Sequence, residues 1–456
     1  MTDMLSDRPP TVHPTNLLNS ALEMCKNSAL SKDIFKASVI SFDGSIISTS
    51  GMPCVVGSLC KIENSFGRSS TGEVVRIHKN SLEIIPHDVK FPVQIGDTVQ
   101  LLQSHQMVDV GEALLGRVID GLGDPLDELD RPICDEKYML DGTSLNPFKR
   151  RPITEILDVG IRNINALLTI GSGQRVGIIA GSGVGKSVLL SMITRNTTAD
   201  VIVIALIGER GREVASFTKE ILSSQSHEKV VIVAVPADRS PLLRIQGAKR
   251  ATAICEYFRD QGKNVLLIMD SLTRVAHAQR EVGLSLGEQP TSRGYPPSVI
   301  SLLPTLVERT GTSASTNGAI TAIYTVLADG DDVISDPVVD SARAILDGHI
   351  VLSRELAQQG IYPAIDVVQS ISRLMTDIVD DEQIKNSKRL RRLISKYQEN
   401  RDLVLMGGYV QGQDQDLDTA LGLWPDILTF LQQEQSEGNS YESACTSLSQ
   451  LVGHLA

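Results

Sequence analysis

Hydrophobic and polar positions follow three patterns in turn along the chain. Between residues 35 and 102, short apolar runs are separated by Gly, Pro, Asn and Asp. Examples of these runs lie at 37–40, 45–48, 72–77, 82–85 and 98–101. Short strands divided by turn residues are typical of a small β-barrel. We therefore predict a β-barrel domain over residues 27–105, preceded by a flexible, polar arm at 1–26.

From about residue 165 to 375, longer apolar runs alternate with helical stretches such as 241–259. The strand-like runs lie at 175–179, Val201–Ile207, Val230–Val235, 265–269, 320–326 and 349–352. Strand–helix alternation predicts a mostly parallel sheet covered by helices. Beyond residue 380 the apolar spacing becomes helical, with helices expected at 384–400, 417–433 and 441–455. We assign residues 106–378 to the sheet domain and 379–456 to a helical domain.

Composition agrees with a multidomain globular protein. The chain has 456 residues, of which 41% are hydrophobic and 21% charged. No apolar run approaches the length of about 20 residues that spans a bilayer, and the N-terminus lacks an apolar signal core, so we expect a cytosolic protein. The six scattered cysteines are expected to be reduced. A net charge of −12 disfavours a nucleic-acid surface.

Residues 180–187 read AGSGVGKS and directly follow the apolar run 175–179. Such a glycine-rich loop points backbone N–H groups at a phosphate, while Lys186 reaches the β- and γ-phosphates and the Ser187 hydroxyl binds Mg²⁺. Ala180 replaces the usual first glycine, and a small residue still fits there. The pattern predicts an α/β protein with a RecA-like P-loop ATPase core, an N-terminal small β-barrel and a C-terminal helical domain.

Hydrolysis also needs carboxylates near the phosphates. Asp270 ends the apolar run 265–269, and Glu209 follows the run Val201–Ile207. Both are expected at the carboxyl edge of the sheet, beside the P-loop, where Glu209 could polarise the attacking water. The alternative is structural: Asp270 caps a turn and Glu209 belongs to a solvated run of charges.

Several motifs together resemble the catalytic subunits of rotary ATP synthases and, more closely, the type III export ATPases. Besides the P-loop they are LGRVIDGLGDP at 115–125, GERGRE at 208–213, MDSLTR at 269–274, GYPPS at 294–298, DSARAILDGHIVLSR at 340–354 and GIYPAID at 360–366. The run 336–354, with NRDLV at 400–404 and LWP at 423–425, looks most like the flagellar export ATPase. The injectisome paralogue is the close alternative.

The resemblance implies a role for several residues. Glu209 matches the catalytic glutamate of the family and Asp270 its aspartate beside Mg²⁺. Arg210 and Arg274 match arginines on the γ-phosphate side, and Arg373 matches an arginine supplied to the nucleotide of the neighbouring subunit. By sequence alone, Arg373 would be a charge on a helix surface.

Tyr362 matches a ring that packs on adenine, although by sequence alone it would be a core aromatic. The implied ligands are ATP and Mg²⁺, with Ser187 and Asp270 on the metal and Lys186 among the catalytic residues. The implied nucleotide-binding residues are Gly181, Ser182, Gly183, Val184, Gly185, Lys186, Ser187, Val188 and Tyr362.

The family also implies a homohexamer that acts in the cytoplasm, at the inner face of the plasma membrane, with peripheral membrane association only. Expected partners are a stator or regulator protein of the export apparatus, membrane proteins of the export gate, and complexes of chaperones with unfolded export substrates. We expect no nucleic-acid partner. The activity would be ATP hydrolysis that energises or primes export, releases chaperones and delivers substrates to the gate.

Three other functions compete with this interpretation. A rotary ATP synthase subunit is disfavoured because the C-terminal stretch lacks an acidic lever and because Ser187 stands where the synthases usually have Thr. A hexameric RNA translocase would need a basic N-domain rich in aromatic residues. Residues 30–100 hold only four dispersed phenylalanines. A non-catalytic nucleotide-binding scaffold is disfavoured by the presence of both Lys186 and Glu209.

Overall fold

The computed structural model describes residues 35–143, 146–224, 226–291, 294–313, 315–327 and 337–455. The chain divides into two compact units. One consists of residues up to Pro86 together with Phe91–Ser104, and the other of His87–Lys90 together with His105–Ala456. The expected N-terminal arm and Cys25 lie outside the described residues. Cys54, Cys60, Cys134, Cys255 and Cys445 are free thiols, as predicted.

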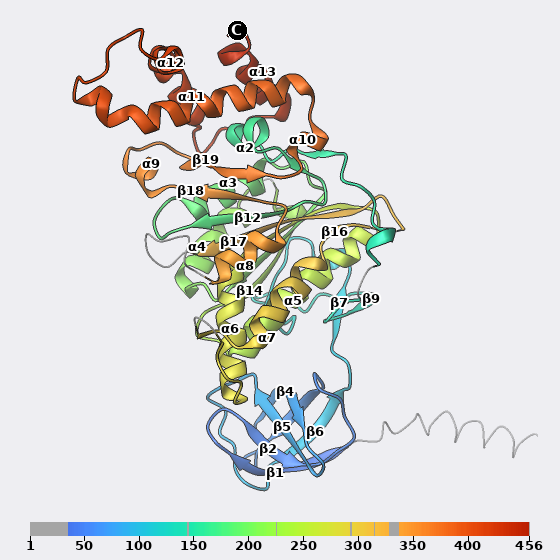
Figure 1. Ribbon diagram of the computed structural model, residues 1–456. Coiled ribbons are helices and arrows are strands. Elements are labelled where there is room, and N and C mark those ends of the chain that lie inside the picture. The colour runs from blue at the N-terminus through green and yellow to red at the C-terminus, as the bar shows by residue number, and fades with distance from the viewer. Residues whose placement is uncertain are drawn as a thin grey trace, which may run out of the picture. The chain divides into compact units, whose positions relative to one another are not determined.

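The first unit is a closed barrel of antiparallel strands in the order β1-β2-β5-β4-β3-β6 (Figure 1). Alternate residues of each strand face the interior, so a polar–apolar alternation is enough to specify the barrel. In β3 the same alternation places Cys60 and Ile62 in the core, with Lys61 between them on the outer side. The strands are β1 (Lys36–Phe42), β2 (Ile47–Ser50), β3 (Leu59–Glu63), β4 (Ser69–Ile77), β5 (Ser81–Pro86) and β6 (Thr98–Gln103).

The second unit is built on a nine-stranded sheet in the order β19-β18-β12-β17-β15-β13-β14-β8, with β16 paired to β17. Neighbouring strands are parallel except for β19 against β18 and β16 against β17. The strands are β8 (Val118–Ile119), β12 (Arg175–Ala180), β13 (Val201–Ile207), β14 (Val230–Val235), β15 (Asn264–Asp270), β16 (Gly311–Thr312), β17 (Ala319–Leu327), β18 (Gly348–Leu352) and β19 (Ile365–Ser372). Two small two-stranded sheets pair β7 (Met107–Val110) with β9 (Glu136–Met139) and β10 (Ile156–Leu157) with β11 (Ile170–Gly171).

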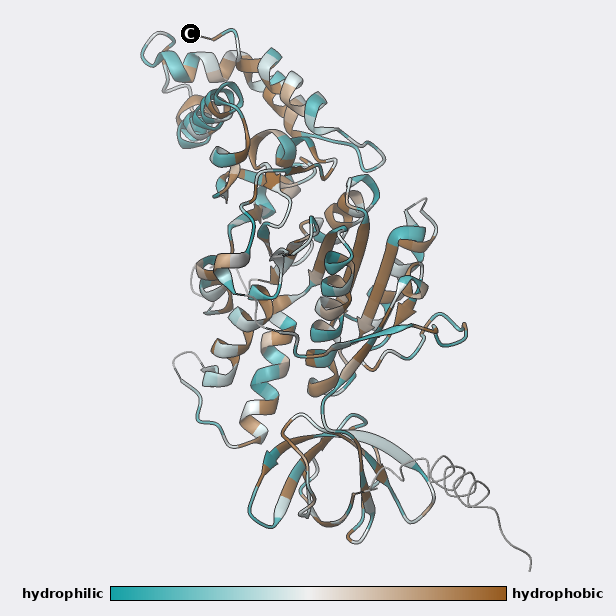
Figure 2. Cartoon of the chain, turned by 90° about the vertical axis from the view of Figure 1, so that its right-hand side faces the viewer, coloured by the Kyte–Doolittle hydropathy of each residue, from teal (hydrophilic) through white to brown (hydrophobic). Residues whose placement is uncertain are grey.

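The central strands are mostly apolar, because helices cover both faces of the sheet (Figure 2). Successive strand residues belong to different hydrophobic clusters: Ile202 and Ile204 to one, Val201 and Val203 to the other. On the Val203 side lie α5 (Pro241–Asp260), α6 (Leu272–Ser285), α7 (Pro297–Glu308) and α8 (Pro337–Ile345). On the Ile202 side lie α2 (Arg162–Leu167), α3 (Lys186–Asn196) and α4 (Gly211–Leu222).

The C-terminal helices are α11 (Asp381–Leu405), α12 (Gln415–Leu431) and α13 (Tyr441–Val452). Their buried side chains, such as Leu390, Ile427 and Leu448, join the same cluster as Ile164 of α2 and Ile202 of the sheet. The remaining short helices are α9 (Arg354–Gln358), α10 (Met375–Ile378), η1 (Glu112–Leu114), η2 (Pro147–Lys149) and η3 (His227–Lys229). Within the described ranges, no helix is both long and apolar enough to cross a membrane.

Candidate active site

The phosphate-binding loop, residues 181–185, connects β12 to α3 at the carboxyl edge of the sheet. Gly183 and Gly185 have φ angles of 79° and 88°, a left-handed conformation that residues with a Cβ rarely adopt. Helix α3 starts at Lys186, and no side chain caps its first N–H groups. Uncapped N–H groups at a helix start attract an anion. The loop thus has the strand–loop–helix setting that its motif predicts.

This loop forms one wall of a cavity of about 530 Å³, which we call the loop cavity. The opposite wall comes from the ends of other strands and the helices that follow them. Parallel strands bring these segments together although they are distant in the sequence. Beyond the loop and the start of α3, the lining residues are Ala180, Glu209, Arg210, Glu213, Arg274 and Leu327.

Lys186 lies between the two carboxylates predicted from the sequence. Its Nζ forms an ion pair with Asp270 and lies 3.7 Å from Oε1 of Glu209. Asp270 is 5% exposed at the end of β15 and also accepts a 2.6 Å hydrogen bond from the Thr325 hydroxyl. The structure therefore brings Lys186, Glu209 and Asp270 together at the carboxyl edge.

The Glu209 carboxyl is partly buried among charged neighbours. Burial raises the pKa of its carboxyl above the usual value, with a smaller contribution from Asp270, while Lys186 and Arg274 act in the opposite direction. Its Oε1 is buried and accepts no hydrogen bond from the described residues. A buried carboxylate oxygen without a donor is costly, and such groups occur where a ligand or water supplies the missing partner.

The three arginines named from the sequence occupy different places. Arg210 and Arg274 line the loop cavity. Arg210 is largely exposed and pairs with Glu213 at 3.0 Å. Arg373 follows β19, is exposed, and lines neither this cavity nor the second one described below. It donates a 3.0 Å hydrogen bond to the backbone carbonyl of Arg343.

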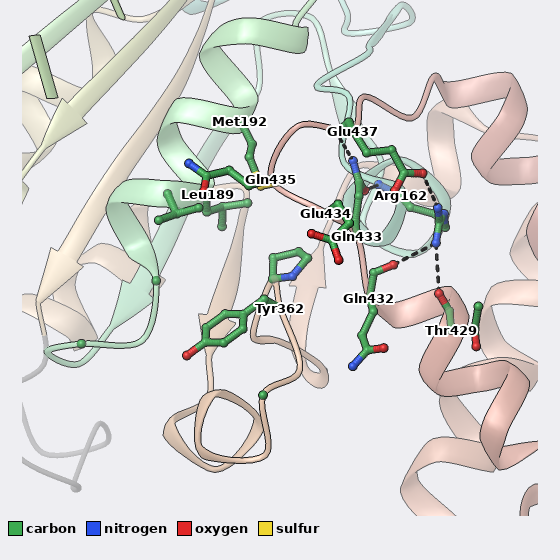
Figure 3. Close-up of a pocket in the computed structure, with 15 residues that line it drawn as sticks. Arg162, Leu189, Met192, Tyr362, Thr429, Gln432, Gln433, Glu434, Gln435 and Glu437 are labelled. Atoms are coloured by element: carbon green, nitrogen blue, oxygen red, sulfur yellow. Dashed lines mark hydrogen bonds and ion pairs between the residues drawn. The ribbon is translucent and has the colours of Figure 1, made fainter. Parts of the chain in front are cut away.

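A second cavity, of about 690 Å³, adjoins the first, and we call it the tyrosine cavity (Figure 3). Gly183, Gly185 and Val188 line both cavities, which makes the two continuous. Tyr362 is 45% exposed, and a Cβ built on Gly185 would lie 3.4 Å from its ring. The apolar wall consists of Leu189 and Met192 of α3.

The remaining wall was not predicted from the sequence. It comes from Arg162 and from residues at and beyond the end of α12, which are Thr429, Gln432, Gln433, Glu434, Gln435 and Glu437. The run QQEQSEG looks like a solvated loop, and no motif marks it. Only the packing of the C-terminal helices against α2 brings these residues beside Tyr362.

The oxygen atoms at the loop cavity suit a divalent cation. The carboxylates of Glu209 and Asp270 lie beside Lys186, and Oε1 of Glu209 accepts no hydrogen bond from the described residues. Hard cations such as Mg²⁺ bind carboxylate and hydroxyl oxygens. The Asp270 carboxylate and the exposed Ser187 hydroxyl supply such oxygens and fit the ion.

Two family models match the chain. The model of the ATP synthase alpha/beta family, nucleotide-binding domain, covers residues 160–372. The model of the T3SS EscN ATPase C-terminal domain covers residues 379–450. The first range contains the loop cavity, and the second contains α11, α12 and most of α13.

Curated relatives match nearly the whole chain. A protein of Salmonella typhimurium named "Flagellum-specific ATP synthase" is 49% identical over 415 residues, which are 89% of this chain and 91% of that protein. A protein of the same name from Pseudomonas aeruginosa is 47% identical over 412 residues, covering 90% of this chain and 91% of its own.

Among solved structures, the assembled ATPase EscN of the enteropathogenic E. coli type III secretion system matches with a TM-score of 0.86. It is 43% identical and covers 91% of this chain and 100% of its own. The same ATPase in complex with its central stalk EscO matches with a TM-score of 0.84 and 42% identity, again covering 91% and 100%. The chain therefore belongs to the ATP synthase alpha/beta family and, within it, to the ATPases of flagellar and type III protein export.

Proposed function

We propose that this protein hydrolyses Mg·ATP to ADP and phosphate as a subunit of a homohexameric ring, and that hydrolysis serves flagellar protein export. One observation carries the catalytic part. A buried carboxylate oxygen of Glu209 lacks a hydrogen-bond donor and lies 3.7 Å from the P-loop lysine, inside a cavity lined by that loop. This geometry supports Glu209 as the group that would polarise water beside a phosphate cradle.

The phosphates would bind in the loop cavity. The first N–H groups of α3 and the Lys186 ammonium face them, and Mg²⁺ held by Ser187 and Asp270 would neutralise part of their charge. Lys186 already pairs with Asp270 and Glu209, so an entering phosphate would give its ammonium a further anion. The Tyr362 ring would pack on the base in the tyrosine cavity, beside the apolar side chains of α3.

Glu209 would orient the attacking water and accept its proton as the oxygen attacks the γ-phosphorus. The bond from that phosphorus to the bridging oxygen breaks, and ADP leaves with the electron pair. Burial makes Glu209 a stronger base than an exposed carboxylate, because it raises the pKa. Arg274 and Arg210, which line the same cavity, would stabilise charge on the transferred phosphoryl group.

The hexamer would complete the site. Arg373 is exposed and lines neither cavity of its own chain, which suits an arginine offered to a neighbouring copy. The name of the EscN structure describes that relative as assembled, and a second structure contains its central stalk. We extend both features to this chain: a ring of identical subunits, and a stalk or stator protein as partner.

The curated relatives from Salmonella typhimurium and Pseudomonas aeruginosa, which are named flagellum-specific, support export through the flagellar system, and injectisome export is the alternative. In this role the ring would work at the inner face of the plasma membrane, release chaperones from export substrates, and deliver the unfolded chains to the gate.

The test compares Glu209→Gln with wild type. Phosphate release from Mg·ATP should fall by about 10³-fold in the variant, while Mg·ADP binding by calorimetry stays within about threefold, because the cradle is retained. Loss of Mg·ADP binding in Glu209→Gln would contradict its assignment to the water.

The ring is tested by dilution. Turnover per subunit should rise with protein concentration in parallel with the sedimentation coefficient, since a complete site needs two chains. Full turnover from a dilute monomer would contradict the ring.

A further inference from the structure

The segment between α12 and α13, residues 432–440, is fixed to the ATPase core by hydrogen bonds that converge on one glutamine. Gln433 is 6% exposed. Its side-chain oxygen accepts a 2.8 Å hydrogen bond from the backbone N–H of Arg162. Its amide nitrogen donates to the carbonyls of Gly160 at 2.8 Å and Glu437 at 2.9 Å. All the polar atoms of this buried side chain therefore have partners within the core and the segment itself.

The backbone of Gln433 contacts the tyrosine cavity directly. Its N–H donates a 2.9 Å hydrogen bond to the carbonyl of Tyr362, the residue whose ring lies beside Gly185 of the phosphate loop. The side-chain hydrogen bonds of Gln433 to Gly160 and Arg162 fix the position of the residue, and with it the position of its backbone N–H. Gln433 therefore helps to hold the backbone of Tyr362 in place.

Arg162 reinforces this connection from α2. Its guanidinium donates to the carbonyls of Thr429, Phe430 and Gln432 at 3.0–3.2 Å, where α12 ends, and pairs with Glu437 at 2.8 Å (Figure 3). The last carbonyls of a helix lack partners within the helix and carry partial negative charge, so an arginine is a favourable cap there.

We infer that Gln433 is a positioning residue for the nucleobase. By fixing the α12–α13 segment against α2 and Tyr362, it keeps the tyrosine cavity closed on the side of the C-terminal helices and couples occupancy of that cavity to α12. This inference rests on the proposed function, because it takes ATP as the ligand. It assigns affinity for the base, and not the chemical step, to a residue outside every motif of the sequence.

The test uses one probe that carries a nucleobase and one that does not. Mg·ADP occupies both cavities, whereas Mg·tripolyphosphate occupies the loop cavity alone. Gln433→Ala should raise the Kd for Mg·ADP about tenfold, equivalent to about 1.4 kcal/mol, and leave the Kd for Mg·tripolyphosphate within about twofold. In turnover, KM for ATP should rise with kcat nearly unchanged. A general loss of structure would weaken binding of both probes.

Two further variants control the test. Gln433→Glu keeps the shape and the acceptor for Arg162 but replaces the two N–H donors with an oxygen facing two carbonyls, so it should weaken Mg·ADP at least as much as Gln433→Ala. Gln413→Ala truncates an exposed glutamine between α11 and α12 and should bind both probes as wild type does.

Trp424 on α12 supplies a second readout. It is the chain's only tryptophan and stacks on Tyr397, with ring centroids 3.6 Å apart and an interplanar angle of 14°. Mg·ADP should change its emission in the wild type and change it less in Gln433→Ala at saturation, while Mg·tripolyphosphate should not. An equal response to both probes would place the coupling in the loop cavity and overturn the inference.

The failure of the inference is distinct from failure of the proposed function. If wild type binds Mg·ADP and hydrolyses ATP but Gln433→Ala keeps the wild-type Kd for Mg·ADP, the inference alone is wrong. If wild type binds neither probe, the proposed function is wrong.

Discussion

The two cavities of the nucleotide site are built in opposite ways. The loop cavity takes its charged residues from segments that follow parallel strands, and several of them are paired, as Lys186 is with Asp270. The tyrosine cavity is assembled from α3, the segment before β19, and the segment after α12, and its wall is mostly uncharged. The difference teaches that the residues for the chemical step and those for base affinity belong to different parts of the nucleotide site. Substitutions around the loop cavity should change kcat, and those around the tyrosine cavity should change KM.

The largest effect should come from a residue that lines neither cavity. Arg373→Ala should lower kcat by about 10³–10⁵-fold, the usual contribution of an arginine finger, while nucleotide binding and folding remain. Mixed with Glu209→Gln subunits, which are inactive alone, the variant should regain part of the activity, because some interfaces then combine an intact Arg373 with an intact Glu209. Steady-state phosphate release over a series of mixing ratios measures this.

No rescue in a ring confirmed as mixed by sizing would count against Arg373, unless turnover requires all sites. Doping either variant sparsely into wild-type rings distinguishes the two cases, because a strictly concerted ring loses activity much faster than linearly with the inactive fraction.

Within the loop cavity, Lys186→Ala should lower kcat/KM by at least about 10²–10³-fold, since it removes a charge aimed at the transferred phosphate. Binding of Mg·tripolyphosphate should fall as well, which distinguishes Lys186 from Glu209. Calorimetry with that probe, beside a turnover assay, gives both values. Unchanged affinity for the probe would break the assignment of this cavity to phosphates.

In the tyrosine cavity, Tyr362→Ala should raise KM for ATP about tenfold or more through lost stacking, with kcat within about threefold. Tyr362→Phe keeps the ring and should stay near wild type. Initial rates over a range of ATP concentrations test the split. A fall in kcat as large as the rise in KM would erase the distinction between the cavities.

The smallest effect concerns stability. Burial raises the pKa of Glu209, so the folded state holds this proton more tightly than the unfolded chain. Stability from this group is full below the ordinary glutamate pKa and is lost as pH rises through the folded value. Glu209→Gln should therefore raise Tm at neutral pH, by on the order of 2 °C. The gain should vanish below about pH 4. A gain that does not depend on pH would contradict this origin.

The loop cavity could be predicted from the sequence because each of its charged residues follows an apolar strand. Glu209 follows β13 and Asp270 ends β15, and these two strands are parallel neighbours in the sheet, so their carboxyl ends lie close together. The tyrosine cavity could not, since Gln433 and Arg162 are 271 residues apart and meet only through helix packing. In the barrel, the short β-rich runs and the turn residues between them predicted a small barrel of short strands. The roles of Arg373 and Tyr362 came from family resemblance, and they remain predictions.

The shared hydrophobic cluster of α2, the sheet and α11–α13 affects how this protein could be recombined with its relatives. The predicted boundary at residue 379 suggests that the helical domain could be exchanged between relatives. A chimera joined there would take Ile164 from one parent protein and Ile427 and Leu448 from the other. Side chains from two different parent proteins would then have to pack together in one hydrophobic core. A chimera that folds well should therefore take α2 and the segment after α12 from the same parent.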